Sequence, residues 1–418
     1  MIKKVLNFLF KKGIKVPFIV FFIPLFFIIS ILLIIIIANI YYELVVYSEH
    51  LSPQFSSERI YSVKNLTTKA EDFLRLEDGG YLILGTLEVN DDDSDIYLIR
   101  TDHNGDTIWT KRIGSEEVEE GYKIVRADGN CFLILASKGK DKIVGGNYIY
   151  TIKIDNQGKI LSNRTFGDSL RWIPKHIVKN NNNFLIIGTS IFASKNQVYL
   201  INVNDNLDPI WTKKYFSEIT AAHAYCRSTD NKHIIGGVVL KHNCNDKGCL
   251  MKVDTRGNLE WIRIIGGADT TIAFIDEIVR LKQYEYLAFG KIRLPDKKDQ
   301  DIFTFTFDDK GKIHQFKVYI NSFYNYISSI YKHPSSGYIG TGRADFKLYL
   351  FRIDDDGNIL WSQFVQPEYR VSYPVGGIIN DNNEIVIIGT TRSYGRGLCS
   401  IFFVKTDTLG NIIDKGRE

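Results

Sequence analysis

One predicted hairpin tip carries the densest group of metal-binding and redox-active residue types in the chain. It reads His242-Asn243-Cys244-Asn245-Asp246-Lys247-Gly248-Cys249. Across a hairpin, the spacing between Cys244 and Cys249 allows the Cα separation of a disulfide, and an oxidising exterior would favour that bond. Free thiols are an alternative, and so is a metal site built with His242 and either His223 or His233. We expect the disulfide and no metal.

Other chemical motifs are few. Asp354-Asp355-Asp356-Gly357 resembles the start of a calcium loop, but the later bidentate Glu of such loops is missing. The chain contains no G-x-S-x-G, H-E-x-x-H or G-x-x-x-x-G-K-[ST], which mark common hydrolases, zinc proteases and phosphate-binding proteins. We therefore assign no catalytic residue, no metal and no cofactor from the sequence.

Composition narrows the class of protein. The chain has 418 residues with 44% hydrophobic and 24% charged residues, as in folded proteins. Its net charge is +4, and residues 1–50 hold five lysines and two glutamates, so the remaining chain is close to neutral. Nucleic-acid binding needs a basic footprint that this body lacks, and we expect no nucleic-acid partner.

A repeated phrase must position whatever functional residues the chain has. An apolar strand is followed by D-x-x-G and often by Trp, first at Asp102, Gly105 and Trp109. Further copies start 46 to 54 residues apart, at Asp155, Asn204, Asp254, Asp308, Asp354 and Asp407. A second apolar phrase, first at residues 80–85, precedes each copy by about twenty residues. With two more strands per unit, this period predicts an all-β fold, a seven-bladed β-propeller of four-stranded antiparallel blades.

The repeat also predicts how the ring closes and how the blades pack. Residues 59–65 resemble an outermost strand that lacks its own blade, and the last unit ends weakly. We expect residues 59–65 to supply the fourth strand of the last blade and to hide its open edge. A tryptophan at one repeated place is expected to wedge between blades. The D-x-x-G segments are expected to be tight turns.

These motifs resemble those of two propeller groups. One is a set of prokaryotic secreted or membrane-anchored repeat proteins with G-G-Y-[IL]-[IL]-x-G and D-x-x-G-x-x-x-W; the other, more distant, is the quinoprotein-like repeat. The likeness covers about residues 59–415 and implies a propeller. Quinoprotein dehydrogenases have adjacent cysteines and eight blades, whereas this chain has no adjacent cysteine pair. The resemblance therefore implies no cofactor and favours a non-enzymatic scaffold.

The longer connections between predicted strands point to a binding face. In a four-stranded meander the second-to-third-strand and blade-to-blade connections emerge on the same side, and here they vary most in length. Such variation marks a binding face in repeat proteins. Aromatic residues of these connections would be the anchors: Phe323, Tyr324, Tyr326, Tyr369 and Tyr373. The alternative is that they only cover strand ends.

The N-terminal region predicts a membrane address. Residues Phe18 to Ala38 contain no charge, and 21 residues in a helix span about 30 Å, the thickness of a bilayer core. The run is too long for a typical signal peptide. Five lysines precede it, which places the N-terminus in the cytoplasm. We expect a transmembrane signal-anchor that binds the lipid bilayer through Phe18–Ala38.

The predicted organisation therefore has four parts. Residues 1–16 form a basic cytoplasmic N-terminus, 17–42 the transmembrane anchor, 43–58 a linker and 59–418 the propeller. The leading hypothesis is a membrane-tethered, extracytoplasmic binding or scaffold propeller with a protein, peptide or glycan partner on the long-loop face. The alternative is a propeller enzyme, a lyase or oxidoreductase, acting at the central channel. A channel lined by convergent titratable residues would favour the enzyme.

Overall fold

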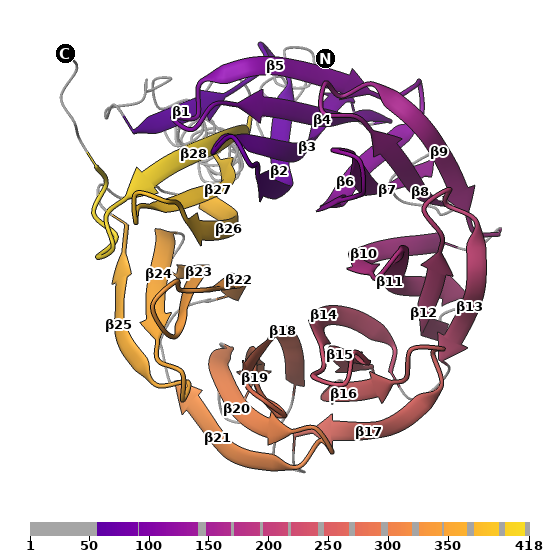
Figure 1. Cartoon of the computed structure of the whole chain (residues 1–418), viewed down its shortest axis with the longest axis vertical. Helices are drawn as coiled ribbons and strands as arrows, with labels where there is room; N and C mark the ends of the chain where they lie inside the picture. Colours follow the sequence, from indigo (N-terminus) through magenta and orange to yellow (C-terminus); the bar gives the residue numbers. More distant parts are fainter. Residues whose placement is uncertain are drawn as a thin grey trace, which may run out of the picture. The chain divides into compact units, whose positions relative to one another are not determined.

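The computed structural model divides the chain into two units, residues 1–50 and 51–418. It describes residues 57–90, 92–140, 148–168, 171–192, 195–215, 219–240, 246–266, 272–293, 300–319, 326–344, 347–365, 372–392 and 398–413. All of these belong to the second unit, and its sheets follow one another around a ring (Figure 1).

The strands fall into four concentric sets. The innermost set, nearest the axis in Figure 1, is β2 (Thr67–Arg75), β6 (Val118–Arg126), β10 (Arg171–Asn180), β14 (Ala221–Arg227), β18 (Ile272–Lys282), β22 (Tyr326–Lys332) and β26 (Ser372–Ile379). The second set is β3 (Tyr81–Asn90), β7 (Phe132–Gly139), β11 (Asn183–Phe192), β15 (His233–Val239), β19 (Glu285–Arg293), β23 (Tyr338–Ala344) and β27 (Ile385–Thr391).

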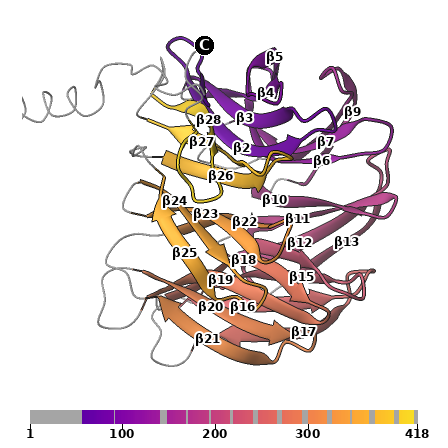
Figure 2. The same ribbon diagram turned by 60° about the vertical axis from the view of Figure 1, so that its left-hand side comes forward.

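The remaining strands lie farther from the axis. The third set is β4 (Asp93–Thr101), β8 (Tyr148–Ile154), β12 (Lys195–Val203), β16 (Lys247–Val253), β20 (Asp301–Asp308), β24 (Lys347–Ile353) and β28 (Ser400–Thr406). The outermost set is β5 (Thr107–Ile113), β9 (Ile160–Phe166), β13 (Pro209–Tyr215), β17 (Leu259–Ile265), β21 (Ile313–Tyr319), β25 (Ile359–Phe364) and β1 (Glu58–Tyr61). Figure 2 shows the same sheets with the ring turned to the side.

The predicted blade count needs correction. Five sheets are four-stranded blades, but strands β2 to β9 form one eight-stranded sheet, so the prediction of seven separate four-stranded blades is wrong. The join is a parallel pairing of β4 with β6 at Ser94 and Val118. The Ser94 hydroxyl also donates to the Glu119 carbonyl over 3.4 Å. A repeat period counts units of sequence and contains no information on hydrogen bonds between neighbouring units.

The predicted N-terminal helix also lacks support. Residues 18–38 lie outside the described residues. No helix in the part of the chain that the structure describes is long and apolar enough to cross a membrane. The fold that the structure supports is therefore an all-β propeller.

The prediction for ring closure is confirmed. Strand β1 pairs antiparallel with β28, with Arg59 opposite Phe403 and Tyr61 opposite Ile401. It forms the outer strand of a sheet in the order β1-β28-β27-β26. Tyr61 then reaches the next sheet, because its hydroxyl donates to the Gly105 carbonyl over 2.6 Å. The first strand of the propeller therefore completes the last blade and also fastens it to the β4–β5 turn.

The D-x-x-G segments are tight turns, as predicted. In the first copy the Asp102 carboxylate accepts hydrogen bonds from the backbone N–H of Asn104 and Asp106, over 2.8 and 2.9 Å. Gly105 has φ of +84°, a backbone conformation that favours glycine. Equivalent bonds recur in other copies, for example at Asp254 and Asp354. The turns fix the outer strand of each unit against the third strand.

Tyr61→Ala should lower the free energy of unfolding by about 3 kcal/mol or more, because a buried aromatic ring and its hydrogen bond are both lost. Tyr148→Ala, at a more exposed tyrosine of β8, is the control and should change stability by about 1 kcal/mol or less. Urea unfolding of the full chain measures both. Equal midpoints for the two variants would contradict the role of β1 in ring closure.

Candidate functional site

Every innermost strand contains an irregularity at the same place in its pairing with the second strand. The register shifts after Ala70, Gly121, Pro174, Ala222, Ile275, Ile327 and Pro374. Each shift inserts one extra residue, which is the pattern of a β-bulge. Bulges redirect side chains and are common beside functional sites. The strands that carry these bulges are the ones that surround the axis of the ring (Figure 1).

The first polar contact around the axis joins β2 to β6. The Lys123 ammonium lies 3.2 Å from a carboxylate oxygen of Asp72. The other oxygen of Asp72 accepts the Ile124 backbone N–H over 3.0 Å. The Asp72 side chain is only 10% exposed and that of Lys123 is 33% exposed. Asp72 is therefore held by the backbone, while Lys123 keeps part of its surface accessible.

Two residues of more distant strands interact with Lys123 electrostatically. Burial alone would lower the pKa of Lys123. The electrostatic interactions with Asp72, Tyr331 and Glu277 raise this pKa by a larger amount, so that the net shift is upward. Glu277 lies on β18 and Tyr331 on β22, and β18 stands across the centre of the ring from β2 (Figure 1). We name Asp72, Lys123, Glu277 and Tyr331 the axial cluster.

The protonation states in the axial cluster are unusual. Burial raises the pKa of Glu277 to about 7, although the charge of Lys123 opposes this rise. Burial also raises the pKa of Tyr331, and the charge of Asp72 adds to the effect, so its hydroxyl stays protonated at neutral pH. The cluster therefore offers an ammonium and a hydroxyl as donors, a carboxylate as acceptor, and a carboxyl that titrates near neutral pH.

A second polar group lies beside the cluster. Burial, followed by the charge of Lys123, lowers the pKa of His176 to about 4, and burial lowers that of His223 to about 4. Both rings are neutral at pH 7. A ring nitrogen of His176, Nε2, lies 2.7 Å from the His223 carbonyl oxygen, so it carries the hydrogen and donates. Burial raises the pKa of Glu71 to about 8, and its carboxyl accepts the Thr86 hydroxyl over 3.2 Å.

Among the described residues no three His, Cys, Asp or Glu side chains lie close enough together to hold a metal ion. At the β22 bulge, the Ser328 hydroxyl is buried and has no hydrogen-bond partner within the described part of the chain. Buried hydroxyls normally have a partner.

Of the five aromatic residues predicted to bind a partner, two belong to the described residues. Phe323, Tyr324 and Tyr369 fall outside the described residues. Tyr326 is the first residue of β22. Tyr373 belongs to β26, is half-buried, and has the Arg343 guanidinium 4.2 Å from its ring centroid. The binding role of these residues stays a prediction.

The predicted disulfide is also untested. Cys249 is buried in β16 opposite Gly237 of β15, whereas Cys244 lies outside the described residues. The wedging role predicted for tryptophan is supported in three places. A Cβ placed on Gly158, Gly257 or Gly311 of the following turn would meet the indole of Trp109, Trp211 or Trp261 at 2.9 Å.

The axial cluster was missed by motif searching because its members are far apart in sequence. A signal existed in the repeat itself. Asp72, Lys123 and Glu277 each stand thirteen residues before the small residue of the second strand, Gly85, Ala136 or Gly290. When the units are aligned on that small residue, Asp72, Lys123 and Glu277 occupy the same alignment position. The sequence allows the closed ring that brings these positions around one axis to be inferred, but not the contacts between the side chains.

Comparisons with known proteins support the fold. No family model matches the sequence, and no curated protein matches it. Among solved structures, a protein from Lactobacillus plantarum is 13% identical with a TM-score of 0.50, covering 79% of this chain and 92% of that one. A polysaccharide lyase, an ulvan lyase, is 9% identical with a TM-score of 0.50, covering 69% and 80%.

A third similar structure is the β-propeller domain of the trilobed protease from Pyrococcus furiosus. It is 9% identical with a TM-score of 0.46, covering 82% of this chain and 94% of that chain. Identities this low show the fold alone. The more specific repeat group and the quinoprotein-like relation predicted from the sequence are not confirmed.

Glu277→Gln should change how stability depends on pH. The ordinary pKa of Glu277 is 4.5 and its folded value is about 7, so between these pH values the folded chain holds a proton that the unfolded chain releases. Stability is therefore lost as pH rises through this window. The variant should avoid this loss, which is about 3 kcal/mol at pH 8.

Urea unfolding at pH 5 and pH 8 measures the difference between the variant and the natural chain. The opposite contribution of neutral His176 is common to both chains and cancels. Glu116→Gln, at an exposed residue before β6, is the control and should follow the natural pH dependence. The same result for Glu277→Gln would show that its carboxyl is not desolvated at the axis.

Proposed function

We propose that this protein is a ligand-binding propeller whose site is the axial cluster. The observation that carries the proposal is the convergence of Asp72, Lys123, Glu277 and Tyr331 from four inner strands, with Lys123 interacting electrostatically with the other three. Bringing such groups out of water costs free energy unless they are paired. Perturbed titratable groups that converge in this way are typical of functional sites.

The chemistry of the cluster favours a neutral, hydroxyl-rich ligand such as a saccharide. Lys123 and Tyr331 can donate hydrogen bonds, Asp72 can accept them, and Glu277 can do either according to its protonation. Sugar hydroxyls also act as both donors and acceptors. The charges of Lys123 and Asp72 balance each other across 3.2 Å, so the cluster does not call for a strongly charged ligand.

A second candidate function is proton-transfer catalysis at the same cluster. One observation favours it, namely the Glu277 pKa of about 7, because a general acid or base works best when its pKa lies near the working pH. Tyr331 and Lys123 could then stabilise charge that develops on a substrate oxygen. This reading corresponds to the channel enzyme that the sequence left as an alternative.

The membrane and partner predictions concern other parts of the chain. The bilayer contact and the extracytoplasmic placement depend on residues 18–38, which lie outside the described residues, and they stay predictions. A protein, peptide or glycan partner on the long-loop face also stays a prediction. The axial proposal does not depend on either of them.

Lys123→Met should abolish saccharide binding, because it removes the central donor while keeping much of the apolar stem. A panel of neutral mono- and oligosaccharides, screened with the full chain on an array and then by calorimetry, supplies the ligand. We expect at least a tenfold loss of affinity. Lys111→Met, at an exposed lysine of β5, is the matched control and should bind normally.

Two outcomes would decide against the proposal. The first is that no saccharide of the panel has a higher affinity for the natural chain than for the Lys123→Met variant. The second is saccharide binding that survives in Lys123→Met with unchanged affinity. If a bound saccharide is instead converted to product, and Glu277→Gln still binds it but does not convert it, the second candidate function is the correct one.

A further inference from the structure

Three outer strands, β5, β13 and β17, place an indole ring against the turn of the next unit. Trp211 and Trp261 are half-buried, and a Cβ placed on Gly257 or Gly311 of the next turn would lie 2.9 Å from the respective indole. The glycine is therefore needed to make room for the ring. This Trp–Gly pair is the ordinary filling of the space between successive units.

Three of the seven copies lack the tryptophan, and in the last of them the position is residue 414, which lies outside the described residues. Seven residues after the turn Asp, where Trp261 follows Asp254, the chain has Ser162 after Asp155 and Gln315 after Asp308. Beside Ser162, the next turn carries Leu207 in place of glycine. Leu207 is buried, with 1% exposure, and belongs to one apolar cluster with Leu133 and Ile149 of the preceding unit. Its φ of +67° is unfavourable for leucine, and the burial of its side chain compensates for that strain.

Beside Gln315, the second position without tryptophan, the next turn carries no large apolar residue like Leu207. Gln315 is exposed, and the next turn keeps Gly357, with φ of +82°. Thr304 also stands where Leu250 stands in the preceding blade, since these residues pair with Lys317 and Arg263 at equivalent register positions. Gln315 and Thr304 therefore occupy two positions that hold larger apolar residues, Trp261 and Leu250, in the preceding blade.

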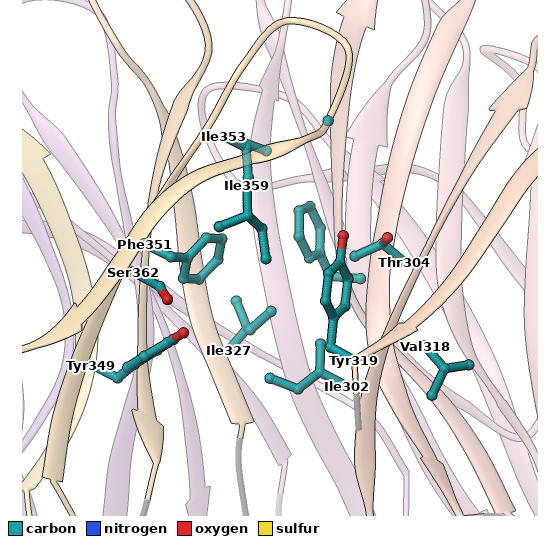
Figure 3. Close-up of a pocket in the computed structure, with 12 residues that line it drawn as sticks. Ile302, Thr304, Val318, Tyr319, Ile327, Tyr349, Phe351, Ile353, Ile359 and Ser362 are labelled. Carbon is teal, nitrogen blue, oxygen red and sulfur yellow. The ribbon is translucent and has the colours of Figure 1, made fainter. Parts of the chain in front are cut away.

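A cavity of about 430 Å³ occupies this interface, between the blades β18–β21 and β22–β25. Figure 3 shows Phe351 and Tyr349 facing Tyr319 and Thr304 across it. Phe289 of β19 also lines the cavity, with its ring centroid 6.0 Å from that of Phe351. The polar lining consists of hydroxyls, and no charged side chain is among the described residues that line the cavity.

We propose that this cavity binds a neutral aromatic compound of about two fused rings. Its volume lies within the range of small-molecule sites, and an apolar cavity of about 150 Å³ already accommodates benzene in another protein. The aromatic walls favour stacked or edge contacts with a ring. The hydroxyls of Thr304, Tyr319 and Ser362 can hydrogen-bond a ring N–H or a hydroxyl. Indole has this size and chemistry, and indole side chains fill the corresponding spaces between other units.

The test uses indole as the probe and the full chain, with binding followed by calorimetry and by ligand-observed NMR. The natural chain should bind one equivalent. The double variant Gln315→Trp/Thr304→Leu restores the residue types of the preceding blade. It should bind indole at least tenfold more weakly and should melt at a higher temperature. Indole binding that is equal in the two chains, or no binding to the natural chain, would overturn the proposal.

A gain-of-site variant provides the matched control. Leu207→Gly removes the side chain that fills the other gap and also relieves its backbone strain, so it should fold and bind a second equivalent of indole. Indole-3-acetate tests the neutrality of the site, because its carboxylate would be buried without a cation. It should bind the natural chain at least tenfold more weakly than indole, and equal binding would contradict a neutral site.

Discussion

Ring closure is the constraint on which the rest of this propeller depends. Each sheet buries apolar residues on both faces, so every sheet needs a neighbour on each side. The last sheet obtains its outer strand from β1, at the start of the propeller, and Tyr61 carries the connection on to the first β4–β5 turn. Closing the circle in this way leaves no end sheet with an uncovered face or edge.

The same closure assembles the axial cluster. The four residues of the cluster, Asp72, Lys123, Glu277 and Tyr331, come from four inner strands. They are far apart in sequence, and the closed ring brings their strands around one axis. Asp72, Lys123 and Glu277 each stand directly after the bulge of their inner strand. Lys123 would be costly to desolvate alone, and Asp72 provides the paired carboxylate that makes its position tenable. The arrangement concentrates polar groups at the one place where all the sheets meet.

The sequence predicts the architecture better than the site. The period of D-x-x-G and Trp predicts the propeller and its tight turns, and residues 59–65 predict the closing strand, because these features recur or complete a repeat. The pairing of Ser94 with Val118 merges two units into one sheet, and it depends on a single contact between units that no periodicity shows.

The site depends on departures from the repeat. Asp72 and Lys123 differ in type at equivalent positions, so a search for recurring or clustered motifs passes over them. The interface cavity follows the same logic, since one of its lining residues, Thr304, stands where the preceding blade has Leu250. The repeated positions of the sequence indicate the architecture, whereas the residues proposed to bind ligands stand at positions where the units differ.

The most direct test of the axial cluster is the pKa of Lys123, measured by NMR on lysine labelled with carbon-13 at the ε position. The structure places it above the ordinary value of 10.5, partly through Glu277 from a distant strand. The account predicts that Glu277→Gln lowers the pKa of Lys123 while the lysine remains in a folded propeller. A Lys123 pKa that is identical in the two chains would show that these strands do not share an axial site.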